Sequence, residues 1–189
     1  MTLAAAPSRI LLALAAAIVG IGAMSVGLVG RYGGERAGDA VPAASSRTDL
    51  VRHLERAPGD GRGWVLLARM DFGADHFADA ATAYERALAT GDKVARDPAV
   101  WCEYADALGM AQGGSLAGRP RELVMRALAL QPTYPRALEM AGSAAVDAGE
   151  YAAAVRHWGD LLAQLPPGSR ERALLEAAIR RANERAALR

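Results

Sequence analysis

The chain has 189 residues, a length that suits one compact domain with an appendage. Hydrophobic residues make up 52% of it but aromatic residues only 5%, and alanine, the best helix former, supplies much of the apolar fraction. The 22 Lys and Arg nearly cancel the 21 Asp and Glu, so no global field attracts nucleic acid, and the single cysteine excludes an intrachain disulfide.

The first predicted element is a transmembrane helix over residues 10–30, a run without any charged residue. About 20 apolar residues in a helix span the hydrocarbon core of a bilayer. The run is longer than the apolar region of a secretory signal, which favours a retained anchor over a cleaved signal. Arg9 precedes the run and Arg31 follows it, so the positive-inside rule decides little. The short tail of residues 1–9 is easier to keep in the cytoplasm than to export, which places the rest of the chain outside.

Residues 31–46 are rich in Gly, Ala, Ser and charge and show no periodicity, which predicts a flexible linker. A helical domain is expected over residues 47–189. It begins with a capping helix near 47–57, which has Leu50, Val51 and Leu54 on one face. The following helices are expected in pairs, near 61–73 and 77–90, 98–111 and 119–130, and 134–148 and 151–164. A final helix near 169–187 follows Pro166-Pro167-Gly168 and has Ser169 as its N-cap.

The three helix pairs are predicted to be repeats. Trp64 and Trp101 are 37 residues apart, and each is followed four residues later by an alanine. Another 37 residues along the chain lie Leu138 and, four further, Gly142. Small residues let the two helices of a pair approach closely, while large ones fill the gaps between pairs. The small residues of this pattern are Ala68, Ala80, Ala105, Gly142 and Ala154, and the large ones are Trp64, Tyr84, Trp101 and Trp158.

This pattern resembles the signature of the tetratricopeptide repeat (TPR), which has a basic period of about 34 residues. The resemblance implies an all-α, right-handed helical solenoid of about three repeats, near residues 61–97, 98–134 and 135–168, with capping helices. Two stretches exceed the basic period, GDKVARDP before Trp101 and AQGGSLAGRP before the next helix, and both are expected in turns. Asp71 stands where the signature usually has an aromatic residue.

In a TPR stack the first helix of each pair lines the concave side. Applied to this chain through the repeat alignment, this family geometry implies a peptide-binding groove lined by the first helices. Three arginines of the groove could clamp a carboxylate, because a guanidinium offers a planar two-donor fork, and the alternative is that they are only solvated surface. Apolar groove residues could hold the apolar face of a peptide helix. The expected groove residues are Arg62, Val65, Arg69, Phe72, Cys102, Asp106, Met110, Arg136, Glu139 and Ser143.

Catalytic, metal and cofactor sites are not expected. His53, His76 and His157 are scattered, and none has a neighbour at the spacing of a zinc ligand. Cys102 has no nearby histidine or second cysteine to activate it as a nucleophile. The Gly-rich turn after Gln112 lacks the phosphate-loop pattern, and there is no C-x-x-C-H for haem attachment. Paired carboxylates and triads are also lacking, so an enzyme is disfavoured.

Three stretches resemble a more specific family, the periplasmic TPR domain of the cytochrome c maturation proteins CcmI or CycH and their relative NrfG. They are residues 105–142, with the turn Q-G-G-S-L-A-G-R-P, residues 149–169, and the trailing Arg/Ala/Glu helix. Longer members have two transmembrane segments with a cytoplasmic loop between them. This sequence contains one such segment, so it looks like the second half of a longer member or like the shorter NrfG-type layout.

The family resemblance implies a non-catalytic subunit of the haem-ligation machinery. Such a subunit holds the C-terminal region of an apocytochrome c and presents it to the haem lyase subunits, without nucleic acid or a cofactor of its own. It would be a single-pass protein of the inner (cytoplasmic) membrane, anchored through residues 10–30 with its C-terminal domain in the periplasm. The alternative is a general membrane-anchored TPR scaffold for envelope protein complexes.

Overall fold

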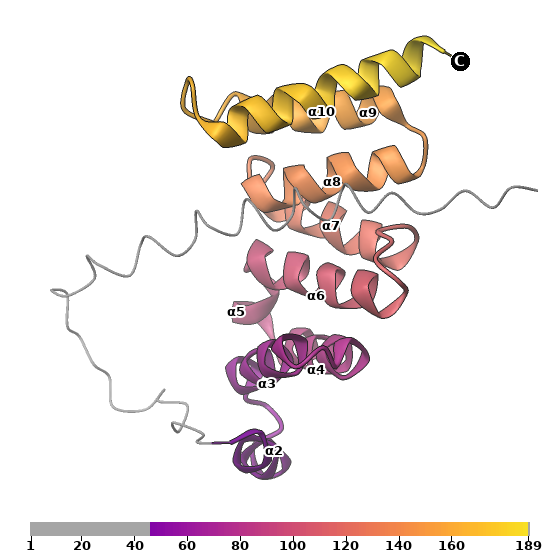
Figure 1. Ribbon diagram of the computed structural model, residues 1–189. Coiled ribbons are helices and arrows are strands. Elements are labelled where there is room, and N and C mark those ends of the chain that lie inside the picture. The colour runs from indigo at the N-terminus through magenta and orange to yellow at the C-terminus, as the bar shows by residue number, and fades with distance from the viewer. Residues whose placement is uncertain (1–45, 189) are drawn as a thin grey trace, which may run out of the picture.

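The computed structural model describes residues 46–188, apart from the side chain of Asp92. The described residues form helices joined by turns, without strands (Figure 1). None of these helices has both the length and the hydropathy needed to cross a bilayer. The predicted tail, the transmembrane segment and the linker before Ser46 lie outside the described residues. In chain order the helices are α2 (Arg47–Arg56), α3 (Gly61–Gly73), α4 (Phe77–Ala89), α5 (Asp92–Ala95), α6 (Pro98–Ala111), α7 (Arg119–Leu130), α8 (Pro135–Asp147), α9 (Tyr151–Leu162) and α10 (Arg170–Ala187).

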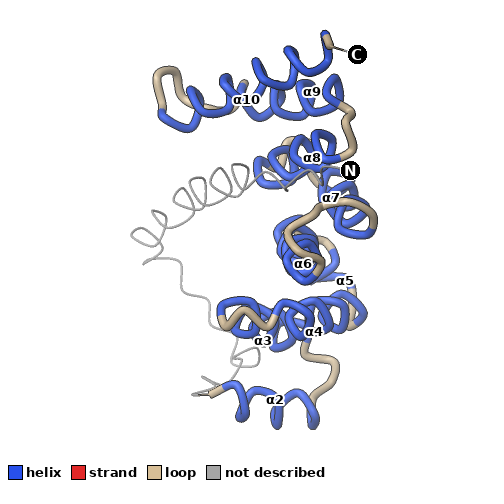
Figure 2. Tube along the Cα trace, turned by 45° about the vertical axis from the view of Figure 1, so that its right-hand side comes forward, coloured by secondary structure: helices blue, strands red, loops and turns tan. Residues whose placement is uncertain are grey.

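The helices stack as successive pairs. Helix α3 packs on α4, α6 on α7 and α8 on α9, while α4 contacts α6, α7 contacts α8, and α9 contacts α10. Figure 2 shows the pairs stacked one above another, with α2 at one end of the stack and α10 at the other. We call the first helices of the pairs, α3, α6 and α8, the first-helix layer, and the second helices, α4, α7 and α9, the second-helix layer. The described part of the chain is therefore an all-helical solenoid of three helix pairs between α2 and α10.

Side-chain caps explain where several helices begin. Ser46, Asp60, Asp97 and Ser169 each accept a hydrogen bond from a backbone N–H in the first turn of the helix that follows. Such a bond satisfies one of the donors that the start of a helix leaves unpaired. The prediction of Ser169 as an N-cap is confirmed.

Small residues sit where the paired helices cross. Ala68, Ala80, Ala105 and Ala154 are fully buried, as the repeat pattern predicts. At Gly142 the ring of Trp158 occupies the space where a side chain would start, and a Cβ there would lie 2.1 Å from the indole Nε1. The indole N–H instead donates to the carbonyl of Glu139 at 3.2 Å. Close approach of α8 and α9 therefore depends on this glycine.

The four large residues only partly meet the expectation that they fill gaps between repeats. Tyr84 is buried and reaches Glu103 of the next repeat, whereas the buried Trp158 lies between the two helices of one repeat. Trp64 and Trp101 are half-buried and pack against the core. The Trp64 indole N–H donates to the Pro58 carbonyl at 2.9 Å, and that of Trp101 to the Ala95 carbonyl at 2.8 Å. Each indole thus binds a carbonyl six residues before it and holds the turn that enters its repeat.

The two long turns are ordered. The stretch GDKVARDP contains the short helix α5, which the sequence pattern did not predict. In the turn between α6 and α7, the side-chain amide of Gln112 donates to the carbonyls of Ser115 and Ala117 at 2.6 and 3.0 Å. Gly113, Gly114 and Gly118 in this turn have positive φ, a conformation that favours glycine. The extra length is therefore taken up by structured turns.

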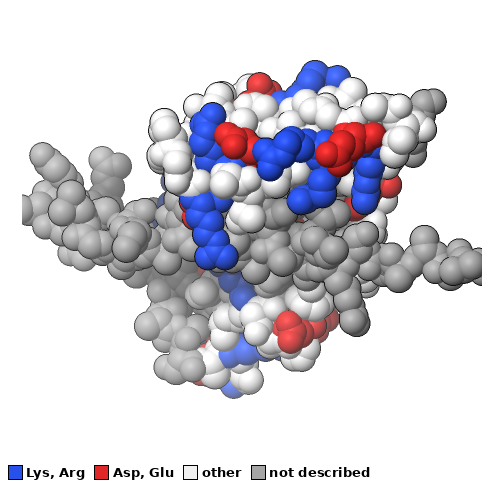
Figure 3. All heavy atoms as spheres, turned by 45° about the horizontal axis from the view of Figure 1, so that its top comes forward, with Lys and Arg blue, Asp and Glu red and all other residues white. Residues whose placement is uncertain are grey.

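Each end of the stack is fixed by an arginine. At one end, Arg47 of α2 makes a two-point contact with the buried carboxylate of Asp71 in α3. At the other, Arg172 of α10 donates to the carbonyls of Leu162, the last residue of α9, and Leu165, at 3.1 and 3.2 Å. On the face beyond α10, side chains of both signs are interspersed (Figure 3). Helix α10 therefore closes the core and presents a polar surface to solvent, as a terminal cap must.

Candidate interaction face

The exposed side of α3 contributes two arginines and a leucine. Arg62, Leu66 and Arg69 are spaced four and three residues apart, so their side chains share one face of the helix. All three are exposed, and Leu66, at 37%, is one of the few large apolar side chains in residues 46–188 that reach solvent to this extent. The expected groove residues did not include Leu66, although its spacing to Arg69 could have identified it.

Helix α6 supplies two carboxylates and a methionine on one face. Glu103, Asp106 and Met110 follow one another at spacings of three and four residues, and all three are half-buried. Glu103 accepts two hydrogen bonds of 2.9 Å from the Nε and Nη2 of Arg69. It also accepts the phenolic O–H of Tyr84 at 3.0 Å. One carboxylate thereby joins α3, α4 and α6, which belong to two successive repeats.

Tyr84 stays un-ionised in this network, because burial and the carboxylate of Glu103 raise its pKa far above the ordinary value of 10.0. Glu103 was not among the expected groove residues. Glu103 could have been identified in the sequence by its separation of 34 residues from Arg69, because this separation equals the basic repeat period.

A second polar cluster joins α6 to α8. Arg136 donates from Nη2 to Asp106 at 2.7 Å and from Nη1 to Glu139 at 3.1 Å. Burial raises the pKa of both carboxyls, although the guanidinium of Arg136 opposes the rise. The hydroxyl of Ser143 donates to the backbone carbonyl of Glu139 at 3.2 Å. The ion pairs of Arg69 and Arg136 therefore place parts of α3, α6 and α8 on one continuous surface.

We call this surface the first-helix face. It consists of the following eight exposed or half-buried residues on α3, α6 and α8: Arg62, Leu66, Arg69, Glu103, Asp106, Met110, Arg136 and Ser143.

Three expected groove residues are instead buried. Val65 is 7% exposed, Cys102 2% and Glu139 6%, because their positions on the helices turn toward the neighbouring helix. They support the face from behind and offer no surface to a partner. Phe72 is half-buried, and its ring meets that of Phe77 edge-on at 5.2 Å.

The arginines also differ from the expectation of open carboxylate clamps. Arg69 and Arg136 already bind carboxylates of the chain itself. Of the three arginines expected in the groove, only Arg62 has no ion-pair partner within residues 46–188. Arg69 uses its Nε and Nη2 for Glu103, and Arg136 uses its Nη1 and Nη2 for two carboxylates, so a further carboxylate would have to share each guanidinium with these partners.

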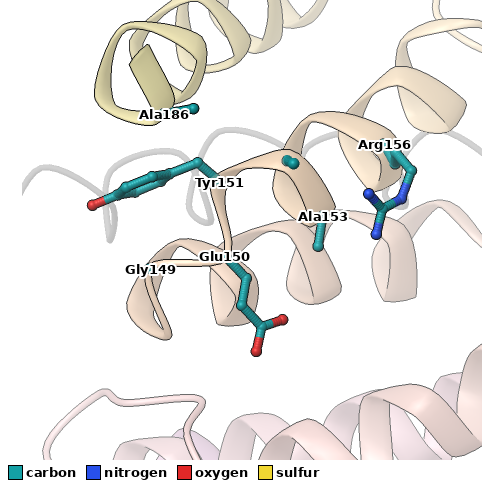
Figure 4. A pocket seen from close by; sticks show the side chains of 7 residues that line it. Gly149, Glu150, Tyr151, Ala153, Arg156 and Ala186 are labelled. Carbon is teal, nitrogen blue, oxygen red and sulfur yellow. The ribbon is translucent and has the colours of Figure 1, made fainter. Parts of the chain in front are cut away.

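A shallow hollow of about 420 Å³ lies away from this face, where α9 begins and α10 ends. It is lined by Gly149, Glu150, Tyr151, Ala152, Ala153, Arg156 and Ala186. In Figure 4 the side chains of Tyr151 and Arg156 lie at opposite ends of the group of lining residues. The Glu150 carboxylate is held by Arg121, with one bond of 2.9 Å. Because four of its seven lining residues are glycine or alanine, the hollow offers few directional contacts.

No group of three or more His, Cys, Asp or Glu side chains in the described part of the chain is arranged to hold a metal ion. Cys102 is a free, buried thiol. Its pKa is raised to about 12, by burial and by the nearby carboxylate of Asp106.

Comparison with known proteins identifies the family. Residues 48–172 match the model described as "Cytochrome c-type biogenesis protein H TPR domain". The chain belongs to this family. Helices α3 to α9, which carry the first-helix face, lie within the matched residues, so the face is part of the CycH-type TPR domain.

Curated relatives agree with this assignment. The chain is 32% identical over 155 residues to the cytochrome c-type biogenesis protein CycH of Pseudomonas aeruginosa, covering 80% of this chain and 37% of the relative. It is 29% identical over 152 residues to CycH of Bradyrhizobium diazoefficiens, covering 80% of this chain and 40% of that protein. The chain thus spans about two fifths of the length of these relatives.

Solved structures support the TPR-like architecture. Two structures titled as MamA superpose with TM-scores of 0.58 and 0.57, each at 14% identity. Each match covers 75% of this chain, and the two cover 86% and 77% of the MamA chains. At this identity the likeness concerns the fold alone. The described domain is therefore a TPR-like solenoid of the cytochrome c-type biogenesis protein H family.

Proposed function

We propose that the chain is a non-catalytic subunit of the haem-ligation machinery, which binds the C-terminal region of an apocytochrome c and presents it to the haem lyase subunits. The match of residues 48–172 to the CycH TPR family carries this proposal. TPR domains are protein-interaction modules, and the family name gives the process in which this one acts.

The first-helix face is the proposed binding surface. It runs over three repeats and combines the exposed Leu66 with the half-buried Met110. The ion pairs between α3 and α6 and between α6 and α8 fix the helices before a ligand arrives. A rigid surface loses less conformational entropy on binding than a flexible one, so this arrangement suits capture of a helical segment.

The proposal includes a membrane position. Residues 10–30 would anchor the chain in the inner membrane, and the helical domain would lie in the periplasm, where it could meet an exported apocytochrome. Protease added to the periplasmic side of intact spheroplasts should then digest the domain. Protection of the domain there, with digestion only after lysis, would contradict this orientation.

Deletion of the gene tests the function. Because apocytochrome would no longer reach the lyase, haem-stained c-type cytochromes should disappear from membranes of the deletion strain and return on complementation. A general envelope scaffold, the alternative, would leave haem staining intact while disturbing other complexes. Unchanged staining in the deletion strain would therefore reject the cytochrome function in favour of the scaffold.

A further inference from the structure

The charges of the first-helix face, together with Glu139 behind it, are balanced and mostly paired. Three arginines face three carboxylates, and two of the arginines use the carboxylates as direct partners. The Arg69–Glu103 pair is fixed by two hydrogen bonds, and Arg136 makes one hydrogen bond to each of Asp106 and Glu139. A charged ligand would have to compete with these existing partners, so net charge on the ligand gives little discrimination.

The guanidinium of Arg69 is held in a fixed orientation. Its Nε and Nη2 both bind Glu103, and Glu103 is itself held by Tyr84. The Arg69 side chain nevertheless remains 54% exposed. A planar cation that is immobile and accessible is a good surface for stacking by an aromatic ring.

The same kind of contact occurs elsewhere in this chain. The guanidinium carbon of Arg86 lies 4.8 Å from the centre of the Trp64 ring. Around Arg69, the apolar side chain of Leu66 lies on the same helix face. Met110 lies on α6 two helical turns after Glu103, and its flexible side chain makes favourable contacts with aromatic rings.

We propose that the first-helix face selects an amphipathic helix by aromatic and aliphatic side chains, with one aromatic ring stacked on the Arg69 guanidinium, and does not select by net charge. This inference rests on the proposed function and names the chemistry of the partner helix. Arg62, the one arginine of the face without an ion-pair partner in residues 46–188, lies at its edge and adds at most a weak preference for an acidic residue.

A peptide titration tests the proposal on the full chain in detergent. The first probe is a helical peptide with blocked termini and a leucine-only apolar face. The second has one leucine replaced by tryptophan, and two further probes carry an acidic or a basic polar face on the leucine sequence. A stacked ring contributes about 1 kcal/mol, so the tryptophan peptide should bind about fivefold more tightly than the leucine peptide. The acidic and basic peptides should bind within about twofold of each other, and each should change by less than about twofold from 50 to 300 mM salt.

Arg69→Lys keeps the charge but removes the planar group. In this variant the tryptophan peptide should bind less than about twofold more tightly than the leucine peptide, because the ammonium group lacks the planar face on which a ring stacks. Arg180→Lys on the exposed side of α10 is the matched control and should keep the preference. Thermal unfolding of both variants shows that the fold is retained.

Three results would overturn the proposal. Discrimination between acidic and basic peptides that exceeds the tryptophan preference would show selection by charge and would leave the proposed function standing. A tryptophan preference that survives Arg69→Lys would place the ring elsewhere. Absence of binding by every peptide would reject both this inference and the binding role, whereas haem staining of the deletion strain reports on the proposed function alone.

Discussion

Gly142 is a residue at which one methyl group decides whether two helices fit. A Cβ there would lie 2.1 Å from Nε1 and 2.3 Å from Cδ1 of the buried Trp158. Gly142→Ala should lower the free energy of unfolding by about 1–3 kcal/mol, the usual cost of overpacking. Denaturant unfolding measures this change.

The matched control is Gly159→Ala in α9, where no heavy atom lies within 4 Å of the added methyl group. This variant should be neutral or more stable by about 0.5–1 kcal/mol, because alanine restricts the unfolded chain. Equal destabilisation by both variants would mean that the contact with Trp158 is not what makes glycine necessary at Gly142.

Cys102 provides a second test at the scale of one residue. Its thiol is 2% exposed, and its pKa is raised from 9.0 to about 12. The folded chain should therefore react very slowly with a thiol reagent at about pH 8, where an unfolded chain already carries some thiolate. Because the pKa of the Cys102 thiol is higher in the folded chain than in the unfolded chain, the protonated thiol stabilises the fold. This stabilisation is lost as the pH rises from 9.0 toward about 12. Rapid labelling of the folded chain would contradict the burial.

Individual site residues were harder to predict from the sequence than the helices that carry them. The repeat alignment placed Arg69, Asp106, Arg136 and Ser143 on the shared surface. It could not separate exposed from buried positions at the edge of that surface, because the rotation of each helix is set by packing. Pairing across repeats was missed for the same reason, since it depends on side chains that meet only after the helices stack.

At the scale of helices, the weakest attachment is that of α2. Leu50 and Leu54 bury its apolar face, and the contact of Arg47 with Asp71 adds the main polar link to α3. Arg47→Gln would leave the 1%-exposed carboxylate of Asp71 without its charged partner, at a cost of about 1–3 kcal/mol. Amide hydrogen exchange in α2 should accelerate.

Arg52→Gln serves as the control, because Arg52 makes only an exposed pair with Asp49 within α2. Its effect should stay within about 0.5 kcal/mol. If amide hydrogen exchange in α2 is equally fast in the two variants, the Arg47–Asp71 contact contributes no more to the attachment of α2 than the exposed Arg52–Asp49 pair does.

Helix boundaries were predicted closely, because caps and breakers are local signals. The predicted spans of α3, α6 and α7 agree with the structure at both ends, and the other spans of the helix pairs differ by a residue or two. Helix α5 was missed because four residues carry too little periodicity to be recognised. Asp71 at an aromatic position of the repeat was noted, but its partner Arg47 lies outside the repeat and could not be inferred.

For the whole molecule, stability depends on coupling between neighbouring repeats. Glu103 joins the first repeat to the second through Arg69 and Tyr84. Glu103→Gln should weaken this coupling, so that α3 and α4 open before α8 and α9, as expected for a solenoid with nearest-neighbour interfaces. Segment-resolved hydrogen exchange should show faster exchange in α3 and α4, and in α2, which packs on α3, but not in α8 and α9. Glu122→Gln, which removes one partner of an exposed pair within α7, should leave the pattern unchanged.

The central claim is that the first-helix face holds the C-terminal region of an apocytochrome c. Site-specific photo-crosslinking in native membranes tests it most directly, with a photoreactive residue placed at Leu66, at Met110 or, as a control, at Met125. Met125 is 46% exposed on α7, in the second-helix layer. We expect crosslinks to the apocytochrome C-terminal region from Leu66 and Met110 and none from Met125. Crosslinks from Met125 alone, or none to any cytochrome, would contradict it.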